Sequence, residues 1–298
     1  MTVVQLADAV GDDRADVLAI CRASLLPEDT NDATGLDELL WRTTPYPTVR
    51  LVAHDGPAIV GVVVATVSAE ASEVGIGYVT LIAVRPDYHR TGLGRRLVRV
   101  MQSRLETLGV TEIWTGGSQP NYWWPGIDNR YSAAHDLFLN EGYTDVEHAF
   151  NMRVALSELV VTNLAVKGIS TRRLTLAEFP EFQSWMRSSW DGVWDRELEL
   201  VLRRTPISCF VAEEDGAYVG FAAYDTNRIG SFGPMGSAPA IRGRGVGAAL
   251  LRLCLRDYFE RGDRDCQISW AGPQTFYRDA VTAEPDREFV RLRKVLVP

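Results

Sequence analysis

The chain has few of the residues that mark several common protein classes. Its 298 residues include only two lysines, Lys167 and Lys294, and four cysteines with no C-x-x-C pair among them. This cysteine pattern indicates neither a zinc site nor a disulfide framework. No apolar run approaches the roughly 18 residues of a membrane span, and residues 1–6 lack the features of a signal peptide. We therefore expect a cytoplasmic protein with no metal and no membrane partner.

The charge of the chain argues against nucleic-acid binding. The formal net charge is −8, whereas a protein that binds nucleic acid needs a basic face. An acidic balance favours neutral or cationic small substrates instead. Because lysine is so scarce, side-chain contacts to phosphate must come mainly from arginine, whose planar fork can bond two oxygens at once.

A glycine-rich motif occurs twice, and the corresponding glycines lie 153 residues apart. Each copy follows an apolar run and a proline (Pro86, Pro239) and opens a long amphipathic helix. Such a turn presents free backbone N–H groups and the positive end of a helix dipole, which form an anion site, most often for phosphate. The two copies are His89-Arg90-Thr91-Gly92-Leu93-Gly94-Arg95 and Arg242-Gly243-Arg244-Gly245-Val246-Gly247.

The same order of elements surrounds both motifs. In each half we expect two helices, a β-hairpin with Asp-Gly at its turn (residues 55–56 and 215–216), a strand into the glycine turn, the long helix and a further strand. The pattern predicts two α+β domains in tandem, each a twisted mixed sheet with helices on both faces. Their expected bounds are residues 1–156 and 168–298, with a linker at 157–167.

The order of elements and the motif resemble the GNAT superfamily of acyl-CoA-dependent N-acyltransferases, here in tandem. The second copy matches the family's Q/R-x-x-G-x-G/A pattern in full, whereas the first has His89 in its first position. The resemblance implies transfer of an acetyl group from acetyl-CoA to the amine of a small molecule. It also implies that both halves hold coenzyme A, in the first half at Ile82, Ala83, Val84, His89, Arg90, Thr91, Gly92, Leu93, Gly94 and Arg95, and in the second at Met235, Gly236, Ser237, Arg242, Gly243, Arg244, Gly245, Val246, Gly247 and Ala248.

Other interpretations compete with this resemblance. Gly243, Gly245 and Ala248 satisfy the dinucleotide pattern G-x-G-x-x-A, but the first copy has Leu97 at the third position. No acidic residue ends the following strand, where a ribose would be held. A non-catalytic acyl-CoA-binding regulator is the alternative from another class, and a mycothiol synthase-like activity is a more specific form of the enzyme hypothesis.

Acyl transfer to an amine needs a base for the ammonium, whose pKa is near ~10.4 for a lysine-like amine, and a proton for the departing thiolate. In the family that proton commonly comes from a tyrosine on the short helix after the fifth strand. The resemblance therefore makes Tyr277 the expected acid, while Phe138 replaces the tyrosine in the first half. On this ground we expect the second domain to be catalytic and the first to bind acyl-CoA as a structural or regulatory module, or to catalyse without a tyrosine. A core tyrosine is the alternative role for Tyr277.

Three carboxylates are candidates for the base. Asp225 ends the strand before the second motif strand, and Asp191 and Asp195 lie between two helices, beside Trp190 and Trp194. Paired indoles and carboxylates can hold an ammonium, although a capped helix end with core tryptophans gives the same pattern. No activated cysteine or serine constellation is present, so we expect direct transfer in a ternary complex.

A second aromatic group is an insertion after the fifth strand of the first half. It contains Tyr122, Trp123 and Trp124, and the second half has no equivalent. These rings either wall an acceptor pocket or fill an interface between domains.

Overall fold

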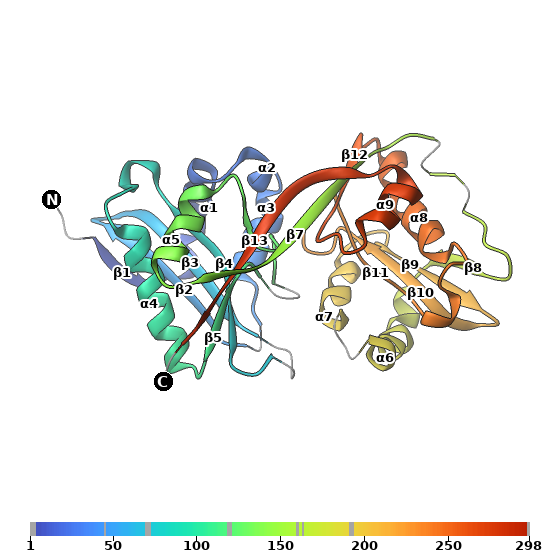
Figure 1. Cartoon of the computed structure of the whole chain (residues 1–298), viewed down its shortest axis with the longest axis horizontal. Coiled ribbons are helices and arrows are strands. Elements are labelled where there is room, and N and C mark those ends of the chain that lie inside the picture. The colour runs from blue at the N-terminus through green and yellow to red at the C-terminus, as the bar shows by residue number, and fades with distance from the viewer. Residues whose placement is uncertain are drawn as a thin grey trace. The chain divides into compact units, whose positions relative to one another are not determined.

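The computed structural model describes residues 4–44, 46–68, 73–117, 121–158, 161–162, 164–190 and 194–296. The chain divides into two compact units, which are Met1–Ala149 with Glu288–Pro298 (unit 1) and Phe150–Arg287 (unit 2). The predicted bounds are therefore corrected: residues 288–298 belong to unit 1, and residues 150–156 belong to unit 2. Each unit contains a mixed sheet with helices on both faces, as predicted (Figure 1).

Unit 1 is built around the sheet β1-β2-β3-β4-β5-β13. Its pairs are antiparallel, except that β4 and β5 are parallel. The strands are β1 (Gln5–Asp8), β2 (Thr48–Asp55), β3 (Ala58–Val67), β4 (Ile76–Val84), β5 (Glu112–Thr115), β6 (Ile127–Asp128), which pairs with β13, and the first part of β7 (Thr144–Ala155). The helices are α1 (Arg14–Ser24), α2 (Pro27–Thr30), α3 (Ala33–Trp41), α4 (Leu93–Thr107) and α5 (Ser132–Asn140).

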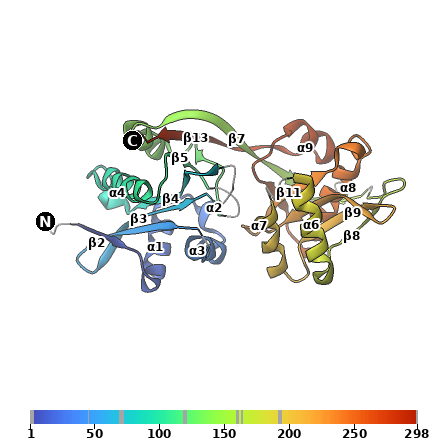
Figure 2. The same cartoon turned by 90° about the horizontal axis from the view of Figure 1, so that it is seen from below.

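The helices of unit 1 cover opposite faces of its sheet, with α4 on one side and α1 and α3 on the other (Figure 2). The apolar stripe of α4 explains its position, because Leu97, Met101 and Leu105 recur at steps of four and are fully buried against the sheet. This packing fixes the start of α4, and hence the glycine turn, at the end of β4.

Unit 2 repeats the arrangement with the sheet β8-β9-β10-β11-β12-β7, in which only β11 and β12 are parallel. Alternate residues of β9 and β10 belong to two hydrophobic cores on opposite faces of the sheet. Phe210 and Ala222 pack with α8, whereas Val211 and Phe221 pack with α6. The elements are β8 (Ser170–Arg173), α6 (Phe179–Trp190), α7 (Asp195–Leu198), β9 (Cys209–Glu214), β10 (Ala217–Tyr224), β11 (Ser231–Ser237), α8 (Val246–Arg261), β12 (Asp265–Ile268), α9 (Gln274–Val281) and β13 (Glu284–Val295).

Strands β7 and β13 each contribute to both units. β7 starts in unit 1, and its residues Met152–Ala155 pair with β12 of unit 2. β13 starts in unit 2, and its residues Arg293–Val295 pair with β5 of unit 1. Each half of the chain therefore supplies the strand that extends the sheet of the other half.

Both predicted hairpins are confirmed. In β9–β10 the turn residues Asp215 (φ 50°) and Gly216 (φ 80°) both have positive φ, as a type I′ turn requires. Within the described residues, no helix has the length and apolar character needed to cross a membrane, and no cluster of three metal-ligating side chains occurs.

Candidate active site

The two glycine turns have the same backbone conformation. A 3-10 helix precedes each long helix (Pro86–Tyr88 and Pro239–Ile241), and the N-cap residues Gly92 (φ 88°) and Gly245 (φ 85°) are left-handed. Neither N-cap has a capping side-chain hydrogen bond. The first N–H groups of α4 and α8 are therefore presented together with the positive end of the helix dipole, which is the chemistry of a phosphate site.

A bulge interrupts the pairing of β4 with β3 in unit 1. Leu81 pairs with Val64 and Val79 pairs with Ala65, so that Thr80 is the extra residue. The parallel ladder between β4 and β5 ends at Val79. Beyond it, one side of β4 faces away from a neighbouring strand, which leaves backbone groups that an extended ligand can pair with.

A cavity of about 670 Å³ lies along this part of β4, and its size is typical of a small-molecule site. It is lined by β4 from Val79 to Val84, by the glycine turn and by α5. The Thr80 side chain also lines it, is only 5% exposed, and has no hydrogen-bond partner for its hydroxyl in the described part of the chain. The cavity thus joins the bulge to the anion site in one continuous space.

Two side chains hold the carbonyl at the end of β4. The Val84 oxygen accepts a hydrogen bond from Ser24 Oγ (2.9 Å) and lies 2.8 Å from His89 Nε2, which can donate to it. Both residues line the cavity. The predicted phosphate contact of His89 stays a prediction, because its ring is engaged with β4 in this structure.

In unit 2, large side chains lie close to the corresponding backbone positions. A Cβ placed on Gly236 of β11 would lie 2.9 Å from Trp190 Cζ2, and one on Gly247 would lie 3.2 Å from Met235 Cε and 3.4 Å from Phe276 Cζ. Three large side chains therefore pack along β11 and the start of α8. These are the elements that correspond to the cavity-lining β4 and α4 of unit 1.

The predicted acid Tyr277 is a core residue of unit 2. It is 7% exposed, belongs to the hydrophobic core under α8, and packs its ring edge-on against Phe232 and Phe276. Burial raises the pKa of Tyr277 to about 12. The surroundings favour the structural alternative for this tyrosine, and its catalytic role stays a prediction.

The Asp225 carboxylate accepts hydrogen bonds that hold the turn between β10 and β11. This carboxylate, 4% exposed, accepts hydrogen bonds from Tyr258 Oη (2.7 Å), the Gly230 N–H (2.7 Å) and Arg261 Nη1 (2.8 Å). A carboxylate whose oxygens are already engaged by three such donors has no lone pair directed at a substrate, so this geometry argues against the role of base. Asp191 lies outside the described residues.

Trp190 and Trp194 belong to an aromatic cluster in the second core of unit 2. Both rings pack against Phe221, at centroid distances of 5.7 Å. Trp185 completes the group beside Trp190. This packing matches the core alternative, and nothing in it singles out an ammonium site.

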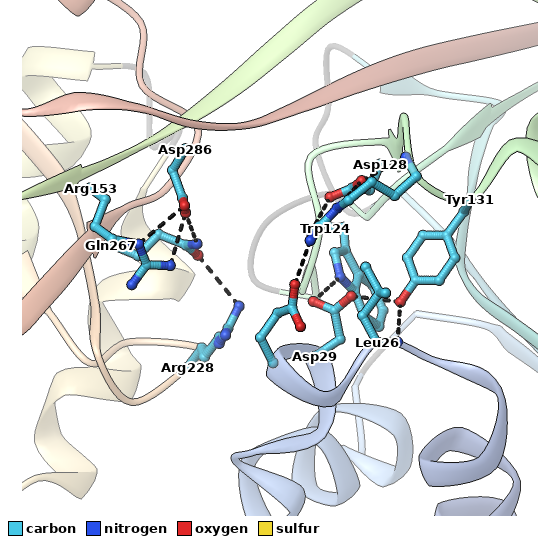
Figure 3. Close-up of polar contacts among 11 residues, drawn as sticks. Leu26, Asp29, Trp124, Asp128, Tyr131, Arg153, Arg228, Gln267 and Asp286 are labelled. Carbon is cyan, nitrogen blue, oxygen red and sulfur yellow. Dashed lines mark hydrogen bonds and ion pairs between the residues drawn. The ribbon is translucent and has the colours of Figure 1, made fainter.

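The inserted aromatics meet a buried carboxylate in unit 1 (Figure 3). Trp124 Nε1 donates to Asp29 Oδ1 (2.9 Å) and Trp123 Nε1 donates to the Asp29 carbonyl (3.2 Å). Asp29 is fully buried, and Trp124 lines the cavity. Tyr122 belongs to the same segment and does not line the cavity. One member of the predicted aromatic wall therefore borders the site.

The sequence did not single out Tyr131, which also lines the cavity. Its hydroxyl donates to Asp29 Oδ2 (2.7 Å) and accepts a hydrogen bond from the Leu26 N–H (2.8 Å). Tyr131 precedes Phe138 by seven residues, or two helical turns, and this spacing is the only signal that could have drawn attention to it.

The four cysteines are buried and lie outside the cavity lining. Burial raises the pKa of Cys21 to about 12 and raises the pKa of the other three thiols as well. Because the thiolate is the reactive form, none of them has the character of an acyl-accepting nucleophile.

Two mixed-sheet units in tandem, each with a glycine turn that opens a long helix, have the architecture expected of an acyltransferase. The model described as "Acetyltransferase (GNAT) family" matches residues 19–122 and 174–275, so the chain belongs to the GNAT family of acetyltransferases. It is an N-acetyltransferase, and the predicted resemblance is confirmed.

Relatives support the tandem form. A mycothiol acetyltransferase of Thermomonospora curvata is 25% identical over 218 residues, which are 68% of each chain. A tandem GNAT protein from the clavulanic acid biosynthesis pathway superposes with a TM-score of 0.72 over 99% of both chains, at 15% identity. The glucosamine N-acetyltransferase region of a fungal β-N-acetylglucosaminidase gives a TM-score of 0.79 at 17% identity, and the match covers 99% of this chain but 38% of that one. At these identities the structures show a shared fold.

Proposed function

We propose that unit 1 binds acetyl-CoA and transfers its acetyl group to the amine of a small molecule. The observation that carries this proposal is the cavity that follows β4 from the bulge at Thr80 to the glycine turn before α4. This reverses the expectation that the second domain is catalytic, although that domain has the complete motif.

The wall of the cavity matches the parts of the donor. The first N–H groups of α4, together with Arg90 and Arg95 on the cavity wall, suit a diphosphate. The part of β4 between the bulge and Val84 suits an extended amide chain that pairs like a strand, whereas the Val84 carbonyl is already held by Ser24 and His89.

The bulge is the place for the reacting carbonyl. A backbone N–H turned out of the ladder beside Thr80 can stabilise the oxyanion that forms when an amine attacks a thioester. Direct transfer follows from the buried cysteines, since the described residues place no reactive thiol on the cavity wall.

The acceptor must be an amine that can lose a proton before it attacks. The likeness to a mycothiol acetyltransferase makes amines related to mycothiol the first members of an acceptor panel. Unit 2 would then act as a scaffold, because Trp190, Met235 and Phe276 lie close to its corresponding backbone positions.

Calorimetry with acetyl-CoA and thiol release with the amine panel test this function. We expect one acetyl-CoA per chain and release of one thiol for each amide formed. Two sites per chain would contradict the scaffold role of unit 2. Binding without turnover across a broad panel would favour a regulator instead.

A further inference from the structure

Tyr131 and Asp29 form a hydrogen-bonded pair on the cavity wall of unit 1, and we propose that this pair removes the proton from the attacking amine. The inference rests on the proposed function, because it concerns the acceptor end of the same cavity. Figure 3 shows the pair with Trp124 and Leu26 beside it.

The direction of the hydrogen bonds suits a proton relay. Tyr131 already donates its hydroxyl proton to Asp29 Oδ2 (2.7 Å), and its oxygen accepts the Leu26 N–H (2.8 Å). A phenol oxygen can accept two hydrogen bonds, so an ammonium in the cavity can donate to it as well. When the amine proton moves to the Tyr131 oxygen, the phenol proton moves to Asp29.

The balance of this step is complete. The amine loses one N–H proton, Tyr131 gains one and gives one, and the Asp29 carboxylate becomes a carboxylic acid. The lone pair freed on nitrogen then forms the bond to the acyl carbon, and the carbon–sulfur bond breaks with its electrons on the thiolate. The nitrogen gives its second proton to water, which leaves a neutral amide, and Asp29 returns the first proton through Tyr131 to the thiolate.

The Asp29 carboxylate accepts hydrogen bonds from two side chains of the cavity wall, Trp124 and Tyr131. It is fully buried, and Trp124 Nε1 bonds the oxygen that Tyr131 does not use. An indole N–H only donates, so Trp124 holds the carboxylate in place but cannot carry its proton away. Of these two partners, only Tyr131 connects Asp29 to the cavity by a group that can pass protons.

Charged groups on the neighbouring elements surround the pair. Arg130 bonds both Glu28 on α2 and Asp128 on β6. On α5, His135 pairs with Asp145, and Asp136 lies on the cavity wall, as do His89, Arg90 and Arg95 of the glycine turn. A pH effect of the pair must therefore be separated from the titration of these groups.

The position of Tyr131 in the sequence suits a residue that replaces the tyrosine missing at Phe138. Phe138 stands where the family commonly has its tyrosine, and Tyr131 lies two helical turns before it, at the start of α5. A phenol is therefore present at the same cavity, on the side of α2 instead of on the inner turn of α5.

The test compares Tyr131→Phe and Asp29→Asn with Tyr143→Phe as the control. Tyr143 is a buried tyrosine of the same unit that bonds Gln102 and does not line the cavity. Thiol release is followed from pH 6 to 10 with two acceptors, 2-phenylethylamine and the far less basic benzyloxyamine, alongside any better amine from the panel.

With the basic amine, both relay variants should lose about 100-fold or more of kcat near pH 7, with KM for acetyl-CoA unchanged. The loss should shrink as the pH rises and be small with the weakly basic amine, since less of that amine needs deprotonation. Tyr143→Phe should match the wild type. A loss that is the same at every pH and for both amines means a structural role and overturns the relay.

The remaining outcomes are also decisive. Wild-type kcat in both relay variants overturns the relay and leaves the proposed function standing. A wild-type chain that binds no acetyl-CoA overturns the proposed function and this inference together. Calorimetry with acetyl-CoA identifies a variant that fails to fold, and if Tyr131→Phe does so, Asp29→Asn, which keeps the shape of the carboxylate, decides the question.

Discussion

Gly94 and Gly247 provide a matched pair for locating the acetyl-CoA site. Each is the second residue of its long helix, α4 or α8. A Cβ would lie 3.2 Å from the end of a flexible side chain in both cases, Leu137 Cδ2 for Gly94 and Met235 Cε for Gly247. Valine at either position should therefore disturb the fold equally, by about 1–3 kcal/mol of overpacking.

The effects on binding should differ. Gly94 lines the cavity, so the branched side chain of Gly94→Val would stand where a diphosphate approaches the N–H groups of α4. Loss of one hydrogen bond to a charged group costs about 1.5–3 kcal/mol, which corresponds to a tenfold to hundredfold weaker Kd. The side chain of Gly247→Val would first meet Met235 and Phe276, so the Kd should stay unchanged.

Isothermal calorimetry with acetyl-CoA measures both quantities, and urea unfolding checks that the two variants lose similar stability. One site per chain in the wild type, weakened only by Gly94→Val, is the expected result. If Gly247→Val weakens binding while Gly94→Val does not, the donor binds in unit 2 and the reasoning from the side chains of that unit is wrong.

Three further results are expected. Asp225→Ala should lower the free energy of unfolding in urea by about 2–3 kcal/mol, because buried donors lose their acceptor. The kcat of this variant should stay unchanged, and a large loss of kcat in folded protein would restore Asp225 as a candidate base. Because the pKa of Tyr277 is raised, its neutral form contributes stability fully below about pH 10, and this contribution is lost as the pH rises towards 12. The variant Tyr277→Phe should therefore lose less stability than the wild type over that pH range. Its absorbance titration at high pH should lack one phenol. Thiol reagents at pH 8 should not slow acetyl transfer, because the pKa of Cys21 is raised to about 12 and the other thiols are equally buried; rapid inactivation of folded protein would contradict direct transfer.

Local features of the fold could be read from the sequence. The Asp215-Gly216 turn, the apolar stripe of α4 and the glycine turns before α4 and α8 depend on residues close together in the chain, and all are present as predicted. The partner of the last strand could not be read, because pairing of β13 with β5 joins residues far apart in sequence and no local pattern specifies it.

The motif alone does not decide which of the two units binds the donor. Arg242 to Gly247 matches the family pattern better than the first copy does, yet a phosphate turn says nothing about the space beside it. That space depends on how the side chains of Trp190, Met235 and Phe276 pack in three dimensions. Asp225 is a similar case, since its place at a strand end was visible but its three donors were not.

The exchange of β7 and β13 has a consequence for biosynthesis. The ribosome makes residues 1–149 first, but the sheet around the cavity receives its sixth strand only when residues 288–295 emerge. Until then the free edge of β5 is exposed on the nascent chain, where chaperones or another strand could pair with it. We therefore expect the half that contains the cavity to be the last to become fully folded, although it is translated first.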